Sequence, residues 1–589
     1  MANYVPPVED MIFLLSNVFD FDRQMAALPG FEEVNTDLAA SVLEEAGKFA
    51  AEVLEPLNRS GDEEGSRLEN GEVVTPKGFK EAYKAFSEAG WSGLSGDPDY
   101  GGQGLPRTLQ ILTDEMVSSA NLSFGLFPGL TRGATEAIGH HAGEDLKALY
   151  LPRMISGEWT GAMALTEASA GTDLGLLTTR AEPQDDGSYR ITGTKIFISS
   201  GDQDFGGNIV HLVLARLPDA PKGVKGISLF LVPKFLPDAD GSLGARNGLS
   251  AGALEHKMGI HAQPTCVMNY DGATGWLIGE PHRGLAAMFT MMNAERLFVG
   301  IEGLGVGEAA VQKATAYAKE RLQGRSLDGS RPLVPIIEHP DVRRMLLTGR
   351  VLCDGARALS VWTALQMDIA GRHPDAGVRN AADGFVALMT PVVKAAFTDF
   401  GFETAVLSQQ VLGGHGYIRE WGMEQFVRDA RITQIYEGTN GVQAMDLTGR
   451  KLPMEDGELA PRFFALVKES LQSAALVPGA EAITTATAQA LDRLERSTAH
   501  ILARAEDPAE AGAAATDYLR LFALTTLGWC WTKMTVAALS AGADAAPAIR
   551  RKPALAAFFA ARILPQTLAL EASILNGPDS LMALTADDF

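Results

Sequence analysis

Cysteine is scarce in this chain: its 589 residues include only Cys266, Cys353 and Cys530. Because the three are odd in number and far apart, neither a disulfide framework nor a Cys-x-x-Cys metal pair can be drawn. The ten histidines show no zinc-binding spacing with cysteine or glutamate, so no metal site is predicted. This cysteine usage fits a reducing compartment, and a cytoplasmic location is expected.

Basic residues are also in short supply. Lys and Arg number 50 against 73 Asp and Glu, which gives a net charge of −23. Such a chain lacks the basic face that phosphate backbones require, so nucleic acid is not expected as a partner. The same charge disfavours general attraction to anionic membranes. Binding of a polyanionic ligand must therefore depend on a few local arginines and on backbone N–H groups.

Long hydrophobic runs and leader features are missing as well. Residues 1–7 (MANYVPP) lack the basic start and apolar core of a signal peptide. The longest apolar run, residues 521–540, approaches the length of a membrane span but contains Lys533. We interpret this run as a buried helix of a bundle, with a helix that touches a membrane surface as the alternative. No integral membrane segment is expected.

The first part of the chain has a helical pattern. Apolar residues recur at helical spacing over residues 34–89 and again over 109–155, with a glycine-rich loop at 94–104 between them. The length of the chain is typical of several domains. The pattern therefore predicts an all-helical N-terminal domain at residues 1–158.

The pattern changes at Trp159, where short β-branched runs alternate with turn residues such as Asp-Gly. Aspartate–glycine turns between β-branched runs are hairpin signals. We therefore predict a middle domain of antiparallel β-structure at residues 159–280, with strands at 189–192, 195–199, 210–216, 226–232 and 265–270.

Long amphipathic stretches follow and predict a helix bundle over residues 281–453. They cover roughly 296–323, 340–370, 380–411 and, more briefly, 437–451. Residues 454–589 are rich in alanine and predict an additional helical domain, broken at Pro478-Gly479, near Asp507 and at Ala541-Gly542. The fold class expected for the whole chain is α+β.

Three short segments differ from these periodic stretches: ALTEASAGTD at residues 164–173, GGHGY at 413–417 and IYEGTNG at 435–441. The last one places a carboxylate, Glu437, between an aromatic residue and a glycine. An isolated glutamate is most often a solvated surface charge, but the neighbours of Glu437 argue against that reading. In this order and at these separations, the segments resemble those of the flavin-dependent acyl-CoA dehydrogenases.

The succession of helical, β and helical domains is also that of the acyl-CoA dehydrogenases, so the resemblance covers roughly residues 35–450. The C-terminal extension is similar to that of the longer-chain members. The resemblance implies FAD as the cofactor and an acyl-CoA thioester as the substrate. It also implies an electron-transferring flavoprotein as the electron acceptor and a homo-oligomer, either a dimer or a tetramer.

The resemblance assigns the catalytic base to Glu437. In the family this residue removes the α-proton of the thioester, while the β-hydride passes to flavin N5. The α-hydrogen is a weak acid, so the developing enolate oxygen needs donors, which in the family are the backbone N–H of the base and a ribityl hydroxyl. Glu295 occupies an alternative position for the base, where we expect a minor role at most. The residues implied at the substrate are Thr172, Arg296, Tyr436 and Gly438.

The resemblance also implies contacts with FAD. Thr166 and Ser199 carry hydroxyls for the flavin ring, and Phe197 stands where relatives often have Trp. Arg321 would reach the pyrophosphate of the FAD in a neighbouring subunit, where a guanidinium can form paired bonds. Relatives have Thr where this chain has Gln323. The full set implied at FAD is Met163, Leu165, Thr166, Phe197, Ser199, Arg321, Gln323, Gln410, Gly413, Gly414 and Thr439.

A narrower likeness is to the branch of the family that dehydrogenates 3-methylthiopropionyl-CoA. It rests on PVED at residues 7–10, HKMGIHA at 256–262, EGTNGVQAMDLTGRKL at 437–452 and the C-terminal extension. A dehydrogenase of medium- or long-chain acyl-CoA and an acyl-CoA oxidase are open alternatives. A catalytically silent acyl-CoA-binding protein is a further one, although it would be expected to lack the base.

Overall fold

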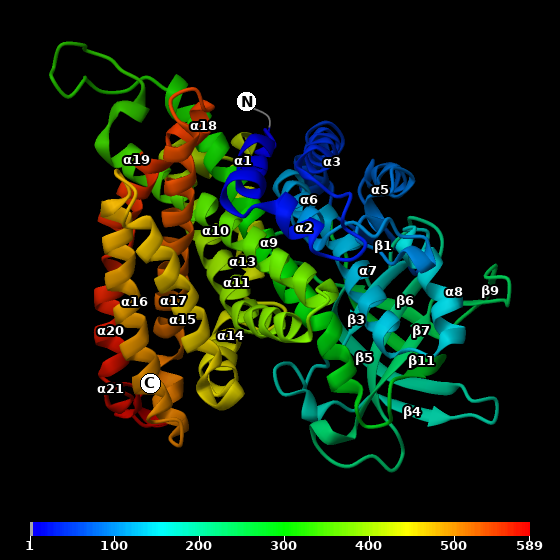
Figure 1. Cartoon of the computed structure of the whole chain (residues 1–589). Helices are drawn as coiled ribbons and strands as arrows, with labels where there is room; N and C mark the ends of the chain where they lie inside the picture. Colours follow the sequence, from blue (N-terminus) through cyan, green and yellow to red (C-terminus); the bar gives the residue numbers. More distant parts are fainter. Residues whose placement is uncertain (1–3) are drawn as a thin grey trace. The chain divides into compact units, whose positions relative to one another are not determined.

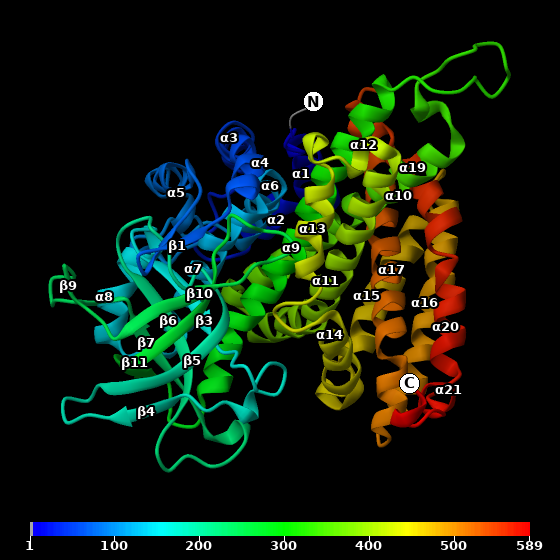
Figure 2. The same cartoon turned by 180° about the vertical axis from the view of Figure 1, so that it is seen from behind.

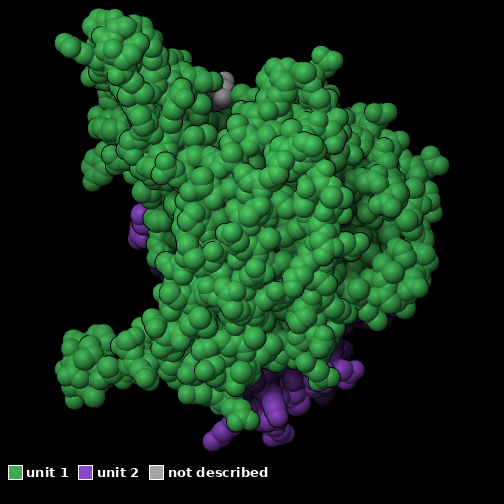
Figure 3. All heavy atoms as spheres, turned by 60° about the vertical axis from the view of Figure 1, so that its left-hand side comes forward, with its two compact units in different colours: residues 1–48, 106–119, 299–589 green, residues 49–105, 120–298 purple. Residues whose placement is uncertain are grey.

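The computed structural model describes residues 4–589, and the chain divides into two compact units. Unit 1 comprises Met1–Lys48, Pro106–Ser119 and Val299–Phe589, whereas unit 2 comprises Phe49–Leu105 and Ala120–Phe298. The elements are labelled in Figure 1 and seen from behind in Figure 2, and Figure 3 distinguishes the two units by colour.

The helical part of unit 2 consists of η2 (Ala50–Leu54), α4 (Glu55–Glu64), α5 (Phe79–Glu88), α7 (Leu122–His141) and α8 (Glu144–Ile155). A hairpin formed by β1 (Arg67–Glu69) and β2 (Glu72–Val74) interrupts these helices. The prediction of helix across residues 34–89 is wrong there, because Asn70 (φ 53°) and Gly71 (φ 81°) form a two-residue turn. Positive φ at both central positions is the conformation of a tight hairpin turn.

A seven-stranded sheet forms most of the remainder of unit 2. The sheet is antiparallel apart from β3, which lies parallel to β6, and a single parallel residue pair between β4 and β6. Strand β3 directly follows α8, so its partner comes from a later part of the chain and not from a hairpin. The strands are β3 (Thr160–Ala164), β4 (Arg180–Pro183), β5 (Tyr189–Ser199), β6 (Ile209–Arg216), β7 (Ile227–Pro233), β10 (Leu249–Leu254) and β11 (Thr265–Ile278).

The strands expected at 189–192 and 195–199 are parts of one strand, β5, and the strand expected at 265–270 extends to Ile278 in β11. A separate hairpin pairs β8 (Phe235–Pro237) with β9 (Leu243–Arg246). Both faces of β6 are buried, and successive side chains of a strand point to opposite faces. One face contributes Val210, Leu212 and Leu214 to a core with α7 and α8, and the other contributes Ile209, Val213 and Ala215 to a second core.

Long helices form the centre of unit 1. They are residues 299–320 of α9 (Gly284–Glu320), α10 (Pro340–Arg372) and α11 (Ala376–Val411), and the last two pack closely along each other. Shorter helices follow: α13 (Glu424–Thr433) and α14 (Asn440–Asp446), which continues into the π-helical turn η9 (Leu447–Lys451). The helix expected from residue 296 begins earlier, at Gly284. The stretch expected from 437 begins as a helix at Asn440.

The C-terminal part of unit 1 is helical, as predicted. It contains α15 (Leu459–Ala474), α16 (Glu481–Leu502), α17 (Pro508–Ala541), α19 (Lys552–Phe558) and α20 (Gln566–Leu575), and the predicted breaks fall between these helices. The apolar run at 521–540 lies in α17, where Leu521, Phe522 and Leu527 are fully buried. Helices α16 and α20 pack against α17, and all three lie side by side in Figures 1 and 2. The interpretation of this run as a buried bundle helix is confirmed.

The N-terminal elements of unit 1 are tied to the bundle through one buried arginine. These elements are α1 (Val8–Phe13), η1 (Leu14–Val18), α2 (Phe21–Ala26), α3 (Thr36–Phe49) and α6 (Arg107–Ala120). Arg357 of α10 is 1% exposed and donates to Glu115 of α6 (2.8 Å), Asp10 of α1 (2.9 Å) and Glu308 of α9 (2.7 Å). A buried guanidinium with all these acceptors is well paired, and removal of one partner would leave a charge uncompensated.

A buried lysine connects the C-terminal helices to the same cluster. Lys552 of α19 is fully buried, donates to Asp354 of α10 (2.9 Å) and forms an ion pair with Asp10. The cluster thus links elements from the N-terminus, the central bundle and the C-terminal segment of unit 1.

Two helical stretches of the described residues reach the length and hydropathy of a membrane span. In α11, 72% of the apolar window is buried inside the protein, so its apolar surface is explained by packing. In the stretch Pro547–Leu575 the buried share is 33%.

Candidate active site

Glu437 lies in a short loop between α13 and α14, and its backbone is left-handed. Its φ is 55° and that of Gly438 is 84°. A left-handed conformation costs a non-glycine residue of the order of 1–2 kcal/mol, so the surroundings must hold it. The buried Gln443 amide donates to the carbonyls of Glu437 (3.2 Å) and Gly438 (3.4 Å). The Thr439 hydroxyl caps α14 by accepting from the Val442 N–H at 3.3 Å.

The ends of this loop are anchored on α11. Asn440 donates to Asp399 (2.7 Å) and to the Ala395 carbonyl (3.1 Å), and it accepts from the buried ammonium of Lys394 (2.9 Å). At the other end of the loop, Gln434 donates to the same Asp399 oxygen at 2.6 Å. One carboxylate thus fixes both ends of the segment that carries Glu437.

A second carboxyl group, Glu302 of α9, lies beneath the loop. Glu302 is fully buried and its Oε2 accepts a hydrogen bond from the Tyr436 hydroxyl, while its Oε1 has no hydrogen-bond partner among residues 4–589. Burial, reinforced by the negative charge of Glu437, raises the pKa of Glu302 to about 8, although the Tyr436 bond and Lys394 oppose the shift. Glu302 is therefore protonated near neutral pH.

Glu302 and Lys394 are not among the site residues predicted from the sequence. Each is a lone charged residue within an apolar stretch of a long helix, VGIEGL at 299–304 and PVVKAAF at 391–397. A charge in such a place indicates a buried partner, because unpaired buried charges are costly. The pattern does not say which residue that partner is.

In unit 2 the structure brings together two segments that were predicted to contact the flavin ring. The Ile196 N–H donates to the Thr166 carbonyl (2.9 Å), and the Lys195 ammonium donates to the Leu165 carbonyl (2.9 Å). Met163 lies at the end of β3, directly before this contact. Thr166 therefore lies beside β5, which ends at Ser199.

A buried ion pair fixes this contact. Lys195 is fully buried and donates to Glu167 at 2.9 Å, and Glu167 also accepts from the hydroxyls of Thr178 (2.7 Å) and Thr179 (2.6 Å). Burial opposes ionisation of Glu167, but Lys195 and these hydrogen bonds hold its pKa at about 2. Glu167 is thus a charged structural anchor.

Phe197 projects from β5 in an unusual way. Its φ is 59° and 59% of its surface is exposed, although it lies between the buried Lys195 and the half-buried Ser199. A large exposed aromatic side chain on a strained backbone indicates a functional constraint, because neither feature stabilises the isolated chain.

Apart from Thr439, the other residues predicted at the cofactor form a separate group in unit 1. Arg321 and Gln323 follow the end of α9, and Gly413 and Gly414 follow the end of α11. Tyr317 of α9 bonds to His415 at 3.0 Å, so these two helix ends lie together. Gln410 is eleven residues beyond Asp399 on α11, or about 16 Å at the rise of an α-helix. This group is therefore distant from the Glu437 loop and from Thr439 within the chain.

The residues predicted at the substrate are divided between the units. Tyr436 and Gly438 flank Glu437 in unit 1, whereas Thr172 and Arg296 belong to unit 2. Thr172 is exposed, and Arg296 is 8% exposed with its guanidinium over the Phe289 ring at 5.8 Å.

Glu295, the alternative position for the base, is only 2% exposed. It packs against Gly133 of α7, where an added Cβ would lie 2.3 Å from its Oε1. Its location is thus the interior of unit 2.

Sequence models of four domains match the chain. They are the N-terminal domain of acyl-CoA dehydrogenase (residues 36–158), its middle domain (162–273), its C-terminal domain (282–452) and the acetyl-CoA dehydrogenase C-terminal-like domain (463–585). Together these matches cover most of the chain, including the extension beyond residue 454.

Relatives and solved structures agree with these matches. The chain is 43% identical to 3-methylmercaptopropionyl-CoA dehydrogenase of Ruegeria pomeroyi, over 98% of this chain and 99% of the relative. It is 34% identical to the broad-specificity linear acyl-CoA dehydrogenase FadE5 of Mycobacterium tuberculosis, over 96% of each chain. The fold is similar to that of Caenorhabditis elegans ACDH-11 in complex with C11-CoA, with a TM-score of 0.75, 21% identity and coverage of 95% of this chain and 92% of the other.

The chain therefore belongs to the acyl-CoA dehydrogenase family, and it is an FAD-dependent oxidoreductase of this α+β fold with an additional C-terminal helical domain.

Proposed function

We propose that this enzyme dehydrogenates 3-methylthiopropionyl-CoA between its α- and β-carbons. The observation that carries the proposal is the 43% identity to the Ruegeria pomeroyi enzyme over 98% of the chain. A broad specificity for linear acyl-CoA thioesters is the second candidate, which the 34% identity to FadE5 over 96% of the chain favours. The expected electron acceptor is an electron-transferring flavoprotein.

The residues of unit 2 fit an FAD ring. Phe197 offers an exposed aromatic face on a strained backbone, and the Thr166 segment lies beside β5. We propose Thr166, Phe197 and Ser199 as the flavin contacts, with Met163 and Leu165 behind them. When bound, FAD supplies the acceptor for the hydride that leaves the β-carbon.

A second group of residues would serve the remainder of the cofactor. We propose that Arg321, Gln323, Gln410, Gly413 and Gly414 contact the adenine and pyrophosphate side. Arg321 would act on the FAD of a neighbouring subunit in a homo-oligomer, which agrees with the distance of this group from Glu437 along α11. Thr439 is assigned to FAD as well, beside its role as the cap of α14.

Glu437 is proposed as the base that takes the α-proton. Asn440 and Gln443 hold the left-handed turn at Glu437 and Gly438 in place. We propose that this turn presents the carboxylate and a backbone N–H to the same thioester. A backbone N–H that donates to the developing enolate oxygen contributes about 3–4 kcal/mol of stabilisation. Tyr436, Thr172 and Arg296 complete the proposed substrate contacts.

Steady-state kinetics with an artificial electron acceptor test this proposal. The enzyme should give a higher kcat/KM with 3-methylthiopropionyl-CoA than with butyryl-CoA or octanoyl-CoA. Equal values for the three thioesters would favour the broad-specificity candidate. Stoichiometric peroxide formation without the added acceptor would instead identify an acyl-CoA oxidase.

A further inference from the structure

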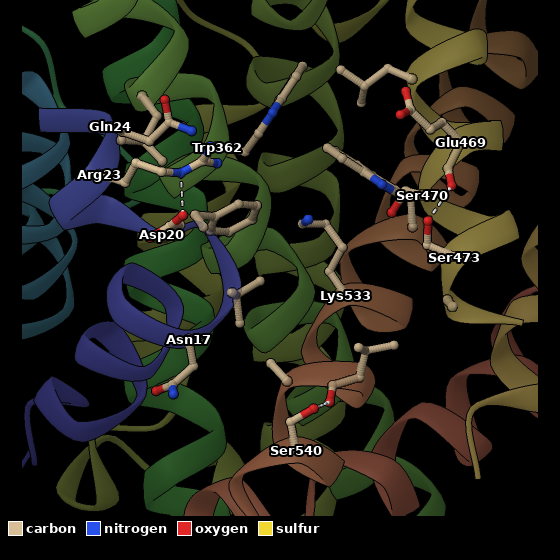
Figure 4. Close-up of a pocket in the computed structure, with 18 of the residues that line it drawn as sticks. Asn17, Asp20, Arg23, Gln24, Trp362, Glu469, Ser470, Ser473, Lys533 and Ser540 are labelled. Atoms are coloured by element: carbon tan, nitrogen blue, oxygen red, sulfur yellow. Dashed lines mark hydrogen bonds and ion pairs between the residues drawn. The ribbon is translucent and has the colours of Figure 1, made fainter. Parts of the chain in front are cut away.

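A cavity of about 690 Å³ lies in unit 1, where α10, α15 and α17 meet the N-terminal segment that runs from η1 into α2. Its volume is typical of sites for small molecules. None of the residues that line it belongs to the candidate active site. Figure 4 shows its lining residues converging from these separate elements.

Two helices provide an apolar wall. Trp362, Leu365 and Ile369 line the cavity from one face of α10, at the spacing of successive helical turns. Val536 and Ala537 of α17 also line it. Each methylene group of a hydrocarbon chain that is buried against this wall would contribute about 0.8 kcal/mol.

Lys533 of α17 extends into this space, as Figure 4 shows. Its ammonium contacts the ring faces of Phe19 (5.6 Å) and Trp529 (6.0 Å), and no carboxylate among residues 4–589 pairs with it. Burial lowers the pKa of Lys533, because the charged form has lost water without gaining an anion. The indole N–H of the buried Trp529, one helical turn away, has no hydrogen-bond acceptor among the described residues either.

The other charged residues around the cavity do not satisfy Lys533. Arg23 is paired with Asp20 at 2.5 Å, and both side chains are largely exposed. Glu469 of α15 lines the cavity with an exposed side chain. Its carboxylate would repel a ligand with several negative charges. A ligand with a single negative charge could still pair with Lys533.

We propose that this cavity binds an amphiphilic monocarboxylate, with its carboxylate at the Lys533 ammonium and its hydrocarbon chain against Trp362, Leu365 and Ile369. The contact with Lys533 would be a charge-assisted hydrogen bond in a half-buried setting, where such bonds are stronger than in water. The site is independent of the catalytic assignment, because it shares no residue with it.

Decanoate is a suitable probe for calorimetry and for tryptophan fluorescence of the flavin-loaded full-length enzyme. Decanoate should bind with a stoichiometry of one and quench fluorescence, because Trp362 and Trp529 line the cavity. Decylamine, which has the same chain length and the opposite charge, should not bind. The Lys533→Met variant should bind decanoate at least about tenfold more weakly, whereas Lys533→Arg should retain binding.

The matched control is Lys468→Met on α15, because Lys468 pairs with Glu495 at 2.6 Å and does not line the cavity. It should bind decanoate like the parent enzyme. A second variant, Val536→Trp, fills the cavity without changing its charge and should abolish binding. The proposal is overturned if decanoate does not bind, if decylamine binds equally well, or if Lys533→Met or Val536→Trp binds as the parent does.

Discussion

The Tyr436 hydroxyl donates a hydrogen bond to Oε2 of Glu302. This bond links the residue that precedes the proposed base to a fully buried carboxyl group of α9. Burial raises the pKa of Glu302, and the negative charges of Glu437 and Asp114 raise it further. The Tyr436 hydrogen bond and the positive charge of Lys394 lower it. Two carboxyl groups therefore share this site, and Glu302 is protonated near neutral pH.

Replacement of Glu302 should change the pH dependence of catalysis more than its rate at neutral pH. The Glu302→Gln variant keeps an acceptor for Tyr436 and resembles the protonated acid, so kcat near neutral pH should stay within about threefold of the parent. The parent kcat should change as Glu302 ionises near pH 8, and that inflection should be absent from the variant. The pH profile of kcat, recorded for the parent and the variant, measures both the rate near neutral pH and the inflection.

Glu302 should also make the stability of the folded protein decrease as the pH rises. The pKa of Glu302 is raised in the folded protein from 4.5 to about 8, so the folded state binds this proton more tightly than the unfolded state. Stability should therefore fall as the pH rises from about 4.5 through 8 and become level above that. Urea unfolding of the Glu302→Gln variant should show a weaker decline over this range. An identical decline in both proteins would contradict the assignment.

Loss of Asn440 should loosen the loop that carries Glu437. Asn440→Ala removes the acceptor for Lys394 and the donor to Asp399, and the loss of a hydrogen bond to a charged group costs about 1.5–3 kcal/mol. We expect kcat to fall by about tenfold or more while FAD remains bound, because the carboxylate loses its position. Thr194→Ala serves as a control, since the Thr194 hydroxyl donates to Asn269 (3.0 Å) at the exposed surface of unit 2. Equal kcat values for both variants would argue against the anchoring role.

Phe197 should contribute to the binding of FAD. Phe197→Ala removes an exposed aromatic face without opening a cavity in the core, so the melting temperature of the apoenzyme should be nearly unchanged. The dissociation constant of FAD, measured by flavin fluorescence, should increase by about tenfold, the value of an aromatic contact of 1–1.5 kcal/mol. The exposed Phe589 gives a matched control as Phe589→Ala, which should bind FAD like the parent.

The buried cluster around Arg357 should be essential to the stability of unit 1. Arg357→Met leaves Glu115, Asp10 and Glu308 without their shared cation, and this should cost about 3–5 kcal/mol. Arg496→Met is the control: it breaks an exposed pair with Glu571 at 2.7 Å, worth less than about 1 kcal/mol. Denaturant unfolding of both variants measures the difference. A loss of the same size in the two would show that the buried cluster has no special role.

Much of the fold was predictable because long amphipathic stretches determine their own structure. The expected helices at 340–370 and 380–411 correspond to α10 and α11, and α17 is buried as its composition indicated. The hairpin at 67–74 was missed because the spacing of apolar residues around it is helical, although Asn70-Gly71 is a turn signal. The parallel pairing of β3 with β6 has no local signal, since the partners are distant in sequence.

In the candidate site, too, the residues with a local sequence signal were predictable and those brought together by folding were not. Glu437 was selected because its neighbours match a known segment, and the left-handed backbone at this position agrees with the glycine that follows it. The buried support for the loop was not predicted. Glu302, Lys394 and Asp399 lie on helices far from Glu437 in sequence, and only folding brings their side chains to the residues that flank it. The assignments of individual FAD and substrate contacts remain predictions.

The most direct test of the central claim is an anaerobic titration of three proteins with 3-methylthiopropionyl-CoA, followed by the flavin absorption. In the parent enzyme the flavin should bleach with near-stoichiometric substrate. Glu437→Gln should keep its bound FAD and lose bleaching rate by about 10²–10⁴-fold, the usual contribution of a general base, whereas Glu295→Gln should bleach like the parent. Bleaching of the Glu437→Gln variant at the parent rate, or loss of bleaching only in Glu295→Gln, would contradict the account.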